Sequence, residues 1–415
     1  MPELNASIIV LLAVFILIAV RQVLRIKLQI WHIMLAGAGA VLVAGEITPV
    51  NAVKAIDIDV ILFLFGMFVA GEALHQSGYL SHLSYKIFKR AGSIDHLILL
   101  IIIVIGGLSA FLMNDTLAII GTPLMLYFSR AHKISPKILL LCLAFAVTTG
   151  SVLSPIGNPQ NLLIAINGNI QNPFVTFFKY LAIPTFINLL LIYAALKLFY
   201  REHFHDELLN HYKEPIEDSG LAFLSRISLI ITAVLILAKI LIVSFGVKCD
   251  FRLTYIALAA AFPVVAFSPK RFIVLKNIDW GTLVFFAAMF VLMRGVWDTG
   301  FFQEIMAEMK LNAASLTGIL FISIVLSQFI SNVPLVALCL PMLITAGAGA
   351  KEMASLAAGS TIAGNLSILG AASNVIIIQN AEKQGKTLTF WEFIRIGLPL
   401  TLVQAFVYWL FLNIL

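Results

Sequence analysis

Long apolar runs, separated by short polar segments, follow one another along the whole chain. The first half predicts spans near 5–21, 28–46 and 57–77, two shorter segments near 95–113 and 117–130, and spans near 138–168 and 174–200. The second half predicts the same series, near 225–245, 253–268, 279–297, 311–330, 334–347, 353–382 and 389–414. Most of these runs approach the ~20 residues that a helix needs to cross a bilayer. The pattern predicts an all-α polytopic membrane protein.

The two series also correspond residue by residue. Three groups of residues in the first half recur in the second half, and within each group the distance along the sequence between a residue and its partner is constant. Asp57, Met67-Phe68-Val69 and Gly78 recur as Asp279, Met289-Phe290-Val291 and Gly300. Leu108-Ser109, Asn114 and Pro123 recur as Leu326-Ser327, Asn332 and Pro341, and Gly157 and Asn161 recur as Gly370 and Asn374. We therefore predict two repeats, residues 1–200 and 225–415, joined by a polar linker over 201–224.

The topology follows from the two pairs of shorter segments. The segment after Asp115 is short and contains Pro123, which favours a re-entrant hairpin over two full crossings. Each half then has five transmembrane helices, one of them discontinuous, plus one hairpin, giving ten spans and two hairpins in total. An odd number of spans inverts the second half relative to the first. Most Lys and Arg then lie in cytoplasmic segments, with a cytoplasmic linker and both termini outside, although charge alone does not separate a hairpin from two spans.

Composition supports a membrane location and excludes several classes of protein. Of 415 residues, 61% are apolar and 12% are charged, with a mean hydropathy of +1.01, which leaves no separate soluble domain. We expect a multi-pass protein of the cytoplasmic (inner) membrane, surrounded by lipid. The net charge of +6 comes from segments that orient helices, so we expect no nucleic-acid partner. The three cysteines are isolated, and no enzyme motif is present, so we expect no metal site, no cofactor and no enzymatic activity.

Four polar interruptions carry the candidate chemistry. The first half has the turn Met113-Asn114-Asp115-Thr116 and a broken span over 154–161, and the second has Ser331-Asn332-Val333-Pro334 and a broken span over 367–374. A broken helix in hydrocarbon exposes backbone groups, so it normally lines a cavity or a binding site. We predict that the following residues bind the substrate: Asn114, Thr116, Ser154, Gly157, Asn158, Gln160, Asn161, Ser331, Asn332, Ser367, Gly370, Ser373 and Asn374.

Asp115 is the strongest candidate for ion coupling. It is the only acidic residue between Asp95 and Glu202, and a carboxylate inside a membrane is costly unless it binds a cation, lines water or faces a partner. We predict a coupling site for H⁺ or Na⁺ formed by Asp115, Asn114 and Asn332. A helix N-cap is the structural alternative for Asp115. Because more polar residues surround the first break and the first turn, we expect the first half to carry most of the polar and ionic chemistry.

These motifs resemble those of the ion transporter superfamily, which joins ArsB-type arsenite permeases, NhaD-type sodium/proton antiporters and divalent-anion–sodium symporters. The Asn114-Asp115 turn is similar to the Asn-Asp element of the ArsB/NhaD branch, and the segment from Ser154 to Asn161 is similar to the superfamily's Thr-Pro-Ile-Gly-Thr-Pro-Pro-Asn signature. The resemblance implies a scaffold domain, a moving transport domain with cation coupling at the hairpin tips, and a homodimer. Neither tip keeps Ser-Asn-Thr, because Asp115 and Val333 replace the Thr, and this asymmetry favours the ArsB-like branch.

Secondary active transport is the function that these residues favour. The first hypothesis is efflux of arsenite or antimonite by proton antiport with alternating access, because an uncharged hydroxide needs hydrogen-bonding partners rather than a cationic clamp. The alternatives are sodium-coupled transport of an inorganic anion or carboxylate, and sodium/proton antiport. An ion channel is a third class. The chain has no ATP-binding Gly-x-x-x-x-Gly-Lys-Ser/Thr loop, so ATP-driven pumping requires a separate ATPase subunit as partner.

Overall fold

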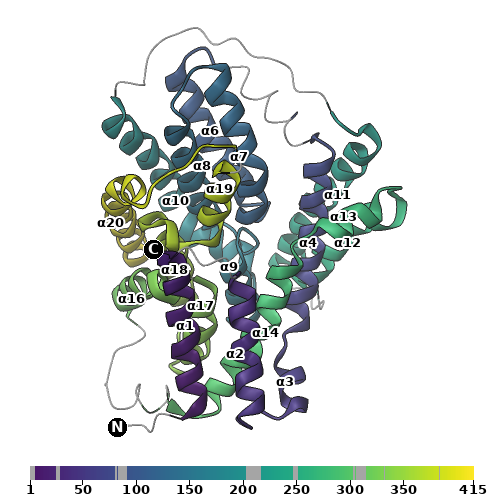
Figure 1. The fold of residues 1–415 in the computed structure, drawn as a ribbon, viewed down its shortest axis with the longest axis vertical. Helices are drawn as coiled ribbons and strands as arrows, with labels where there is room; N and C mark the ends of the chain where they lie inside the picture. Colours follow the sequence, from purple (N-terminus) through teal and green to yellow (C-terminus); the bar gives the residue numbers. More distant parts are fainter. Residues whose placement is uncertain are drawn as a thin grey trace.

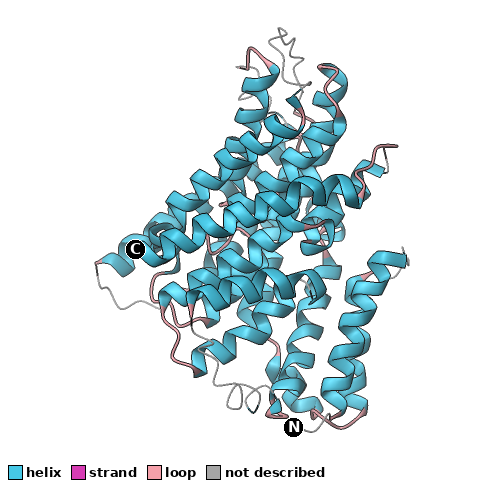
Figure 2. Cartoon of the chain, turned by 90° about the vertical axis from the view of Figure 1, so that its left-hand side faces the viewer, coloured by secondary structure: helices cyan, strands magenta, loops and turns pink. Residues whose placement is uncertain are grey.

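A computed structural model describes residues 5–24, 29–79, 82, 91–201, 216–245, 251–301, 304, 315–330, 332–382 and 384–415. Over these ranges the chain is helical and has no strand (Figure 2). The α helices of the first half are α1 (Ala6–Leu24), α2 (Ile30–Val43), α3 (Pro49–Ala55), α4 (Ile58–Gln76), α6 (Ile94–Ser109), α7 (Asn114–Ala131), α8 (Pro136–Ser151), α9 (Pro159–Asn167) and α10 (Pro173–Phe199). The all-α prediction is confirmed.

The second half has the same order of helices. They are α11 (Ser219–Ser244), α12 (Leu253–Phe267), α13 (Arg271–Asn277), α14 (Trp280–Trp297), α16 (Leu316–Ile330), α17 (Asn332–Thr345), α18 (Ala350–Leu366), the short 3₁₀ helix η2 (Ile368–Gly370), α19 (Ala372–Glu382) and α20 (Phe390–Ile414). Both predicted breaks are present, between α8 and α9 and between α18 and α19. The inversion of the halves, the re-entrance of the hairpins and the side of each terminus stay predictions.

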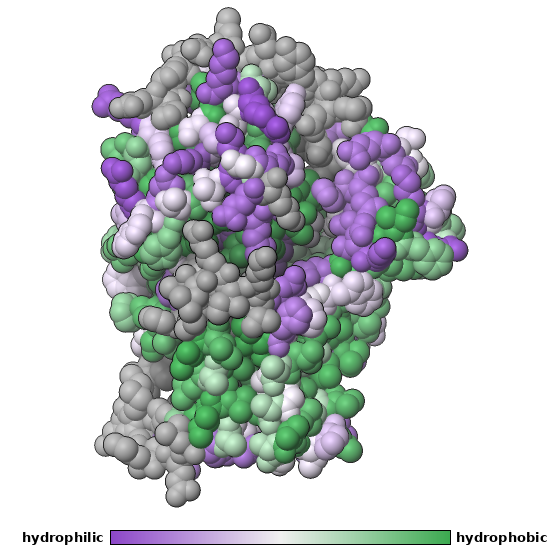
Figure 3. Space-filling view, in the orientation of Figure 1, coloured by the Kyte–Doolittle hydropathy of each residue, from purple (hydrophilic) through white to green (hydrophobic). Residues whose placement is uncertain are grey.

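Helix length divides the elements into two kinds. Within the described ranges, five helices are long and apolar enough to cross a membrane: α4, α10, α14, α20 and the 219–242 part of α11. The helices of each hairpin and of each broken span are 9 to 18 residues long. Figure 3 shows apolar side chains covering much of the lower half of one face, while polar ones gather above them. Such a continuous apolar surface is typical of a protein that faces lipid.

Two short helices were not predicted from the sequence. The helices α3 and α13 each have seven residues and lie directly before α4 and α14. Asp57 and Asp279 separate them from the long helices, because each aspartate caps the next helix: Asp57 Oδ1 accepts from the Val60 N–H at 3.1 Å, and Asp279 Oδ1 accepts from the Thr282 N–H at 3.0 Å. The repeated aspartates of the sequence are therefore helix caps.

The start of α11 precedes the predicted start of the second repeat, and the division of the chain into two repeats and a linker stays a prediction. The helix begins at Ser219, inside the segment predicted as linker, because Asp218 Oδ1 accepts from the Leu221 N–H at 2.9 Å. Asp218 also pairs with Lys270 at 2.8 Å, and the N–H of Glu217 donates to the Ser77 carbonyl at 3.1 Å. The Leu221 N–H and the Lys270 ammonium lower the pKa of Asp218. Residues 202–215 of the predicted linker lie outside the described residues.

The helices pack into two groups. We call α1–α4 with α11–α14 the scaffold group, and α6–α10 with α16–α20 the hairpin group. The most extensive contacts fall within one group, such as α4 with α12 and α2 with α14 in the scaffold group, and α6 with α8 and α16 with α18 in the hairpin group. Figure 1 shows α4, α11, α12 and α13 together on the right, apart from α6, α8 and α10. Contacts between the groups are made mainly through α1, α4 and α14.

Candidate functional site

The hairpin turns and the helix breaks surround one cavity, which we call the central cavity. It has a volume of about 320 Å³ and includes both hairpin tips, at Asp115 and Val333, and the first residues of both restarted helices, Pro159 and Ala372. The remaining lining residues come from α2 and the segment before it, the start of α14 and α19: Gln29, Trp31, Asp279, Gly281, Thr282, Phe285, Phe286, Val375, Ile376 and Gln379. The structure therefore brings the four predicted interruptions together.

Backbone hydrogen bonds hold the first hairpin tip against the first break. The N–H of Asn114 donates to the Gly157 carbonyl at 2.9 Å, and the Asp115 N–H donates to Asn114 Oδ1 at 2.9 Å. A Cβ atom at Gly157 would lie 2.4 Å from the Ser151 carbonyl oxygen, so only glycine fits there. At the equivalent Gly370, an added Cβ atom would lie 2.4 Å from the Ala363 carbonyl oxygen. Both glycines serve close backbone packing.

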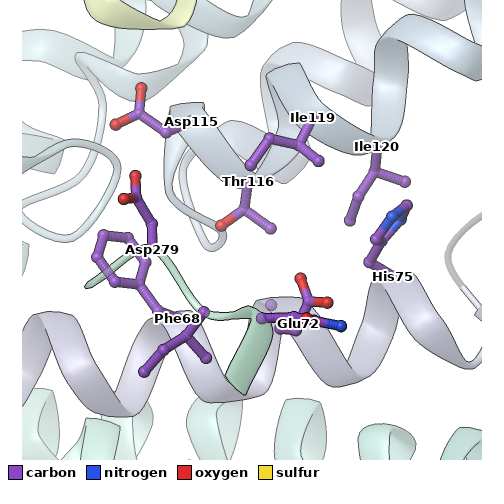
Figure 4. A pocket seen from close by; sticks show the side chains of 11 residues that line it. Phe68, Glu72, His75, Asp115, Thr116, Ile119, Ile120 and Asp279 are labelled. Atoms are coloured by element: carbon purple, nitrogen blue, oxygen red, sulfur yellow. The ribbon is translucent and has the colours of Figure 1, made fainter. Parts of the chain in front are cut away.

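A smaller cavity, which we call the acidic cavity, adjoins the central cavity at Asp115. Its volume is about 60 Å³, and Glu72, His75, Thr116 and Asp279 line it together with Asp115. Figure 4 shows the carboxylates of Asp115 and Asp279 pointing into the same space, with Glu72 and His75 further along α4. Sequence reasoning singled out Asp115 but missed Asp279, although its recurrence with Asp57 was visible. Neither cavity is lined by Lys or Arg among the residues that the structure describes.

The polar side chains of the first break bind one another. Asn158 Nδ2 donates to Ser151 Oγ at 2.9 Å and to Thr361 Oγ1 at 3.2 Å, and Gln160 Nε2 donates to Thr361 Oγ1 at 3.4 Å. Thr361 Oγ1 donates to Asn161 Oδ1 at 3.3 Å. Asn161 Nδ2 in turn donates to the carbonyl of Ser151 at 3.0 Å. These amides therefore lock the first break to α18.

The carbonyl of Ser154 completes this arrangement. It also accepts from Asn161 Nδ2 at 3.0 Å, and the Ser154 hydroxyl accepts from the Ile156 N–H at 3.3 Å. Of the predicted substrate residues, Ser154, Asn158, Gln160 and Asn161 thus all have partners within the protein. A solute would have to compete with those hydrogen bonds.

The second break leaves several polar atoms without partners. Asn374 Nδ2 donates to the Gly364 carbonyl at 2.6 Å, and the Ser367 hydroxyl donates to Gln328 Oε1 at 2.8 Å. The oxygens Asn374 Oδ1, Ser373 Oγ and Asn332 Oδ1, however, have no hydrogen-bond partner within the described ranges. Their residues are only 1%, 1% and 5% exposed. Buried polar atoms are normally satisfied, so these oxygens are candidate acceptors for a ligand or an ordered water.

Smaller side chains explain why the second break is unsatisfied. Where the first break has Ser151, Asn158 and Gln160, the corresponding positions of the second hold Gly364, Ala371 and Ser373. Thr148 corresponds to Thr361, and its buried hydroxyl has no partner among the described residues. A Cβ atom at Gly364 would lie 2.7 Å from Ala371 Cβ and 3.2 Å from Thr148 Cγ2, which places these residues against one another. Ser331 lies outside the described residues.

A third cavity corresponds to the acidic cavity in the other repeat. It has a volume of about 510 Å³, and its lining includes Phe290, Arg294, Trp297, Ala337 and Leu338, the repeat partners of Phe68, Glu72, His75, Ile119 and Ile120. Lys54, Asp57 and Asn167 also line it, so we call it the basic cavity. Arg294 Nε donates to Asp298 Oδ2 at 3.0 Å. The two related cavities thus differ in charge: Glu72 of the acidic cavity corresponds to Arg294 of the basic cavity, and Asp115 corresponds to Val333, which lines the central cavity.

Two curated proteins are similar to this chain over most of its length. An uncharacterized transporter of Mycobacterium tuberculosis is 27% identical over 425 residues, covering 96% of this chain and 95% of that protein. The silicon efflux transporter LSI3 of Oryza sativa subsp. japonica is 28% identical over 444 residues, covering 89% of each. Both relatives are transporters by name.

Solved structures and a family model complete the comparison. The YdaH transporter of Alcanivorax borkumensis has a TM-score of 0.57 at 16% identity, covering 86% of this chain and 84% of that one, and it supports the fold alone. The MtrF structure of Neisseria gonorrhoeae also has a TM-score of 0.57, at 14% identity. The CitMHS model, described as citrate transporter, matches residues 12–362. The chain is a multi-pass membrane transporter and belongs to the CitMHS citrate transporter family, within the superfamily that its motifs resemble.

Proposed function

We propose that this protein exports a small uncharged inorganic hydroxide in exchange for protons, with arsenous acid or its antimony analogue as the first candidate. The observation that carries the proposal is the lining of the central cavity. Two carboxylates and several hydrogen-bonding groups line it, without Lys or Arg among the described residues. An uncharged hydroxide both donates and accepts hydrogen bonds, and it needs no cationic clamp. A silicon efflux transporter among the relatives supports the same class of solute.

The proposal gives separate roles to the two halves. Asn332 and Ser373 lie next in sequence to Val333 and Ala372 of the cavity lining, and in this proposal their oxygens and that of Asn374, unpartnered among the described residues, accept hydrogen bonds from the hydroxyl groups of the solute. Asp115, at the tip of the first hairpin, binds the coupling proton, and Asn114 holds the tip in place through its backbone contact with Gly157. The interlocked amides of the first break give the cavity a rigid wall on the side of α9.

Transport assays with this chain in proteoliposomes test the proposal. We expect arsenite or antimonite flux that is driven by a pH gradient and insensitive to sodium at fixed pH. We also expect cells that express the protein to tolerate more arsenite than cells without it. Unchanged tolerance together with no proton-dependent flux would exclude this solute and this coupling.

Cation-coupled transport of a carboxylate is the second candidate. The description of the family as citrate transporter favours it, and Lys54 and Arg294 of the basic cavity offer positive charge for an anion. Citrate uptake that depends on sodium would establish this candidate over the first. Sodium flux against a pH gradient without any solute would instead establish a sodium/proton antiporter.

The assembly is part of the same proposal. We expect a homodimer in the cytoplasmic (inner) membrane, and proton-driven transport in the absence of an ATPase subunit. Mass measurement of the purified protein in detergent tests the first point, and flux in liposomes that contain only this chain tests the second.

A further inference from the structure

Asp279 occupies a fixed position on the scaffold group. Oδ1 accepts from the Thr282 N–H at 3.0 Å, and Oδ2 accepts from the Thr282 hydroxyl at 2.6 Å. The residue precedes the first turn of α14, where the helix dipole stabilises a negative charge. Its carboxylate is thus held at the edge of the central and acidic cavities, both of which it lines.

Asp115 approaches the same space from the hairpin group. It lies in the first turn of α7, its backbone is tied to Asn114, and its carboxylate lines the same two cavities as that of Asp279 (Figure 4). The other ionisable groups that line the acidic cavity are Glu72 and His75, both on α4 of the scaffold group. Two carboxyl groups thus border the same space, one from each helix group.

The repeat offers a natural comparison for this pair. Asp57 corresponds to Asp279 and caps α4 in the same way, while its Oδ2 accepts from Asn167 Nδ2 at 3.0 Å. The hairpin residue that corresponds to Asp115 is Val333, which carries no charge. Asp57 also lines the basic cavity with Lys54 and Arg294. Only the Asp279 side of the molecule therefore opposes one acid with another.

We propose that Asp279 is a positioning residue that makes cation binding at Asp115 depend on where the hairpin group stands relative to the scaffold group. When Asp115 is deprotonated, repulsion between its carboxylate and that of Asp279 disfavours the arrangement of the helix groups in which the two carboxylates are close. A proton on Asp115 removes that repulsion and stabilises the arrangement. By linkage, the arrangement then holds the proton more tightly, and movement of Asp115 away from Asp279 releases it. This inference rests on the proposed proton coupling at Asp115, and it assigns to Asp279 the link between proton binding and movement of the hairpin group.

The experiment measures the position of the two groups as a function of pH and needs no known solute. Spin labels at Lys133→Cys, beyond α7, and Lys276→Cys, on α13, report their separation in the full chain, and both positions are exposed. The native cysteines are replaced by serine or alanine in every variant. In the parent protein we expect the distance distribution to change with a defined midpoint pH. Asp279→Asn, which can still cap α14, should shrink the pH-dependent change in distance and move the midpoint of what remains toward acid by about one pH unit, the size of effect that a nearby like charge typically has.

Asp57→Asn is the matched control, because it removes the corresponding cap charge where no acid opposes it. We expect its midpoint to equal that of the parent within error. Asp279→Ser, a second neutral capping residue, should reproduce Asp279→Asn and covers the case in which that variant does not fold. An unchanged midpoint in the folded Asp279 variants, or an equal shift in Asp57→Asn, would overturn the inference.

Asp115→Asn separates this inference from the proposed function. It should abolish both the pH-dependent change in distance and proton-driven flux. If flux stays proton-driven in Asp115→Asn, the proposed coupling site is wrong and the inference falls with it. If flux is lost in Asp115→Asn while the Asp279 variants behave as the parent, the proposed function stands and only the role of Asp279 is wrong.

Discussion

The two helix breaks have the same backbone plan but use their polar side chains in opposite ways. At the first break, Asn158, Gln160 and Asn161 share the hydroxyl of Thr361. At the second, the hydroxyl of Thr148 and the oxygens of Ser373 and Asn374 have no partner in the part of the chain that the structure describes. The first break is therefore a cross-link between the repeats, and the second is an open set of acceptors.

This difference changes the expectation that the first half carries most of the polar chemistry. The first half does hold the acid, Asp115, at a hairpin tip. Its amides, however, are already occupied by the protein, whereas Asn332, Ser373 and Asn374 of the second half keep free acceptor capacity. In the duplicated fold, the first break is thus held by hydrogen bonds between its own side chains and α18. The second break has smaller side chains and keeps acceptor oxygens for a ligand.

The largest expected effect comes from removing the amide that is most fully used. Asn161→Ala deletes a donor to three backbone carbonyls and an acceptor for Thr361, and we expect it to lower the free energy of unfolding by roughly 3 kcal/mol. Asn374→Ala, at the equivalent position, should cost roughly half as much but weaken solute binding. Thermal unfolding in detergent measures the first effect, and the concentration dependence of flux measures the second. Equal losses of stability would contradict the division between the breaks.

Restoring the missing side chain at the second break should sharpen the comparison. Ala371→Asn places an amide at the position that Asn158 has in the first repeat, next to Thr148. We expect this amide to bond to the acceptors that the proposal assigns to the solute. Solute affinity should fall about tenfold, equal to about 1.4 kcal/mol, while the melting temperature stays the same or rises. Ala371→Val, which adds volume without hydrogen bonds, is the control for crowding. An Ala371→Asn protein with normal affinity would place the solute elsewhere.

Replacing each of the two equivalent threonines by valine should change the free energy of unfolding differently. Thr361→Val removes a hydroxyl with three partners and leaves them unsatisfied, so we expect a loss of about 2 kcal/mol in the free energy of unfolding. Thr148→Val removes a hydroxyl with no partner and should be neutral or slightly stabilising. Denaturation of the two variants side by side checks this. A destabilised Thr148→Val would mean that an ordered water or ion occupies the second break in the free protein.

The smallest effect concerns the starts of the two repeats. The first helix of the second repeat, α11, is preceded by the acidic cap Asp218, and the Leu221 N–H and Lys270 lower the pKa of that carboxyl group. At the start of α1, the uncharged Asn5 side chain accepts from the Ser7 N–H instead. The stabilisation by Asp218 is therefore present above the unfolded pKa, near 4, and is lost as the pH falls through the folded value. We expect Asp218→Asn to remove a few tenths of a kcal/mol at pH 7 and less at pH 3. Melting temperatures at both values measure this difference.

The sequence predicted the breaks and tips because their signals are local. Gly157, Pro159 and the polar residues around them interrupt an apolar run, and such interruptions end helices wherever the rest of the chain lies. The helices α3 and α13 were missed because seven residues are too few for a hydropathy pattern. The partners of the break residues were also beyond prediction: Thr361 reaches Asn161, and Asp279 reaches the cavities at Asp115, only through packing between distant parts of the chain.

The exchange of Glu72 for Arg294 at equivalent positions has an electrical consequence. The acidic cavity, with Glu72, Asp115 and Asp279, stabilises protons or other cations, while the basic cavity, at the equivalent place in the other repeat, includes Lys54 and Arg294 and stabilises them less. The duplicated fold therefore carries an electrostatic polarity: a cation is held beside the first hairpin tip and disfavoured at the equivalent place in the second repeat.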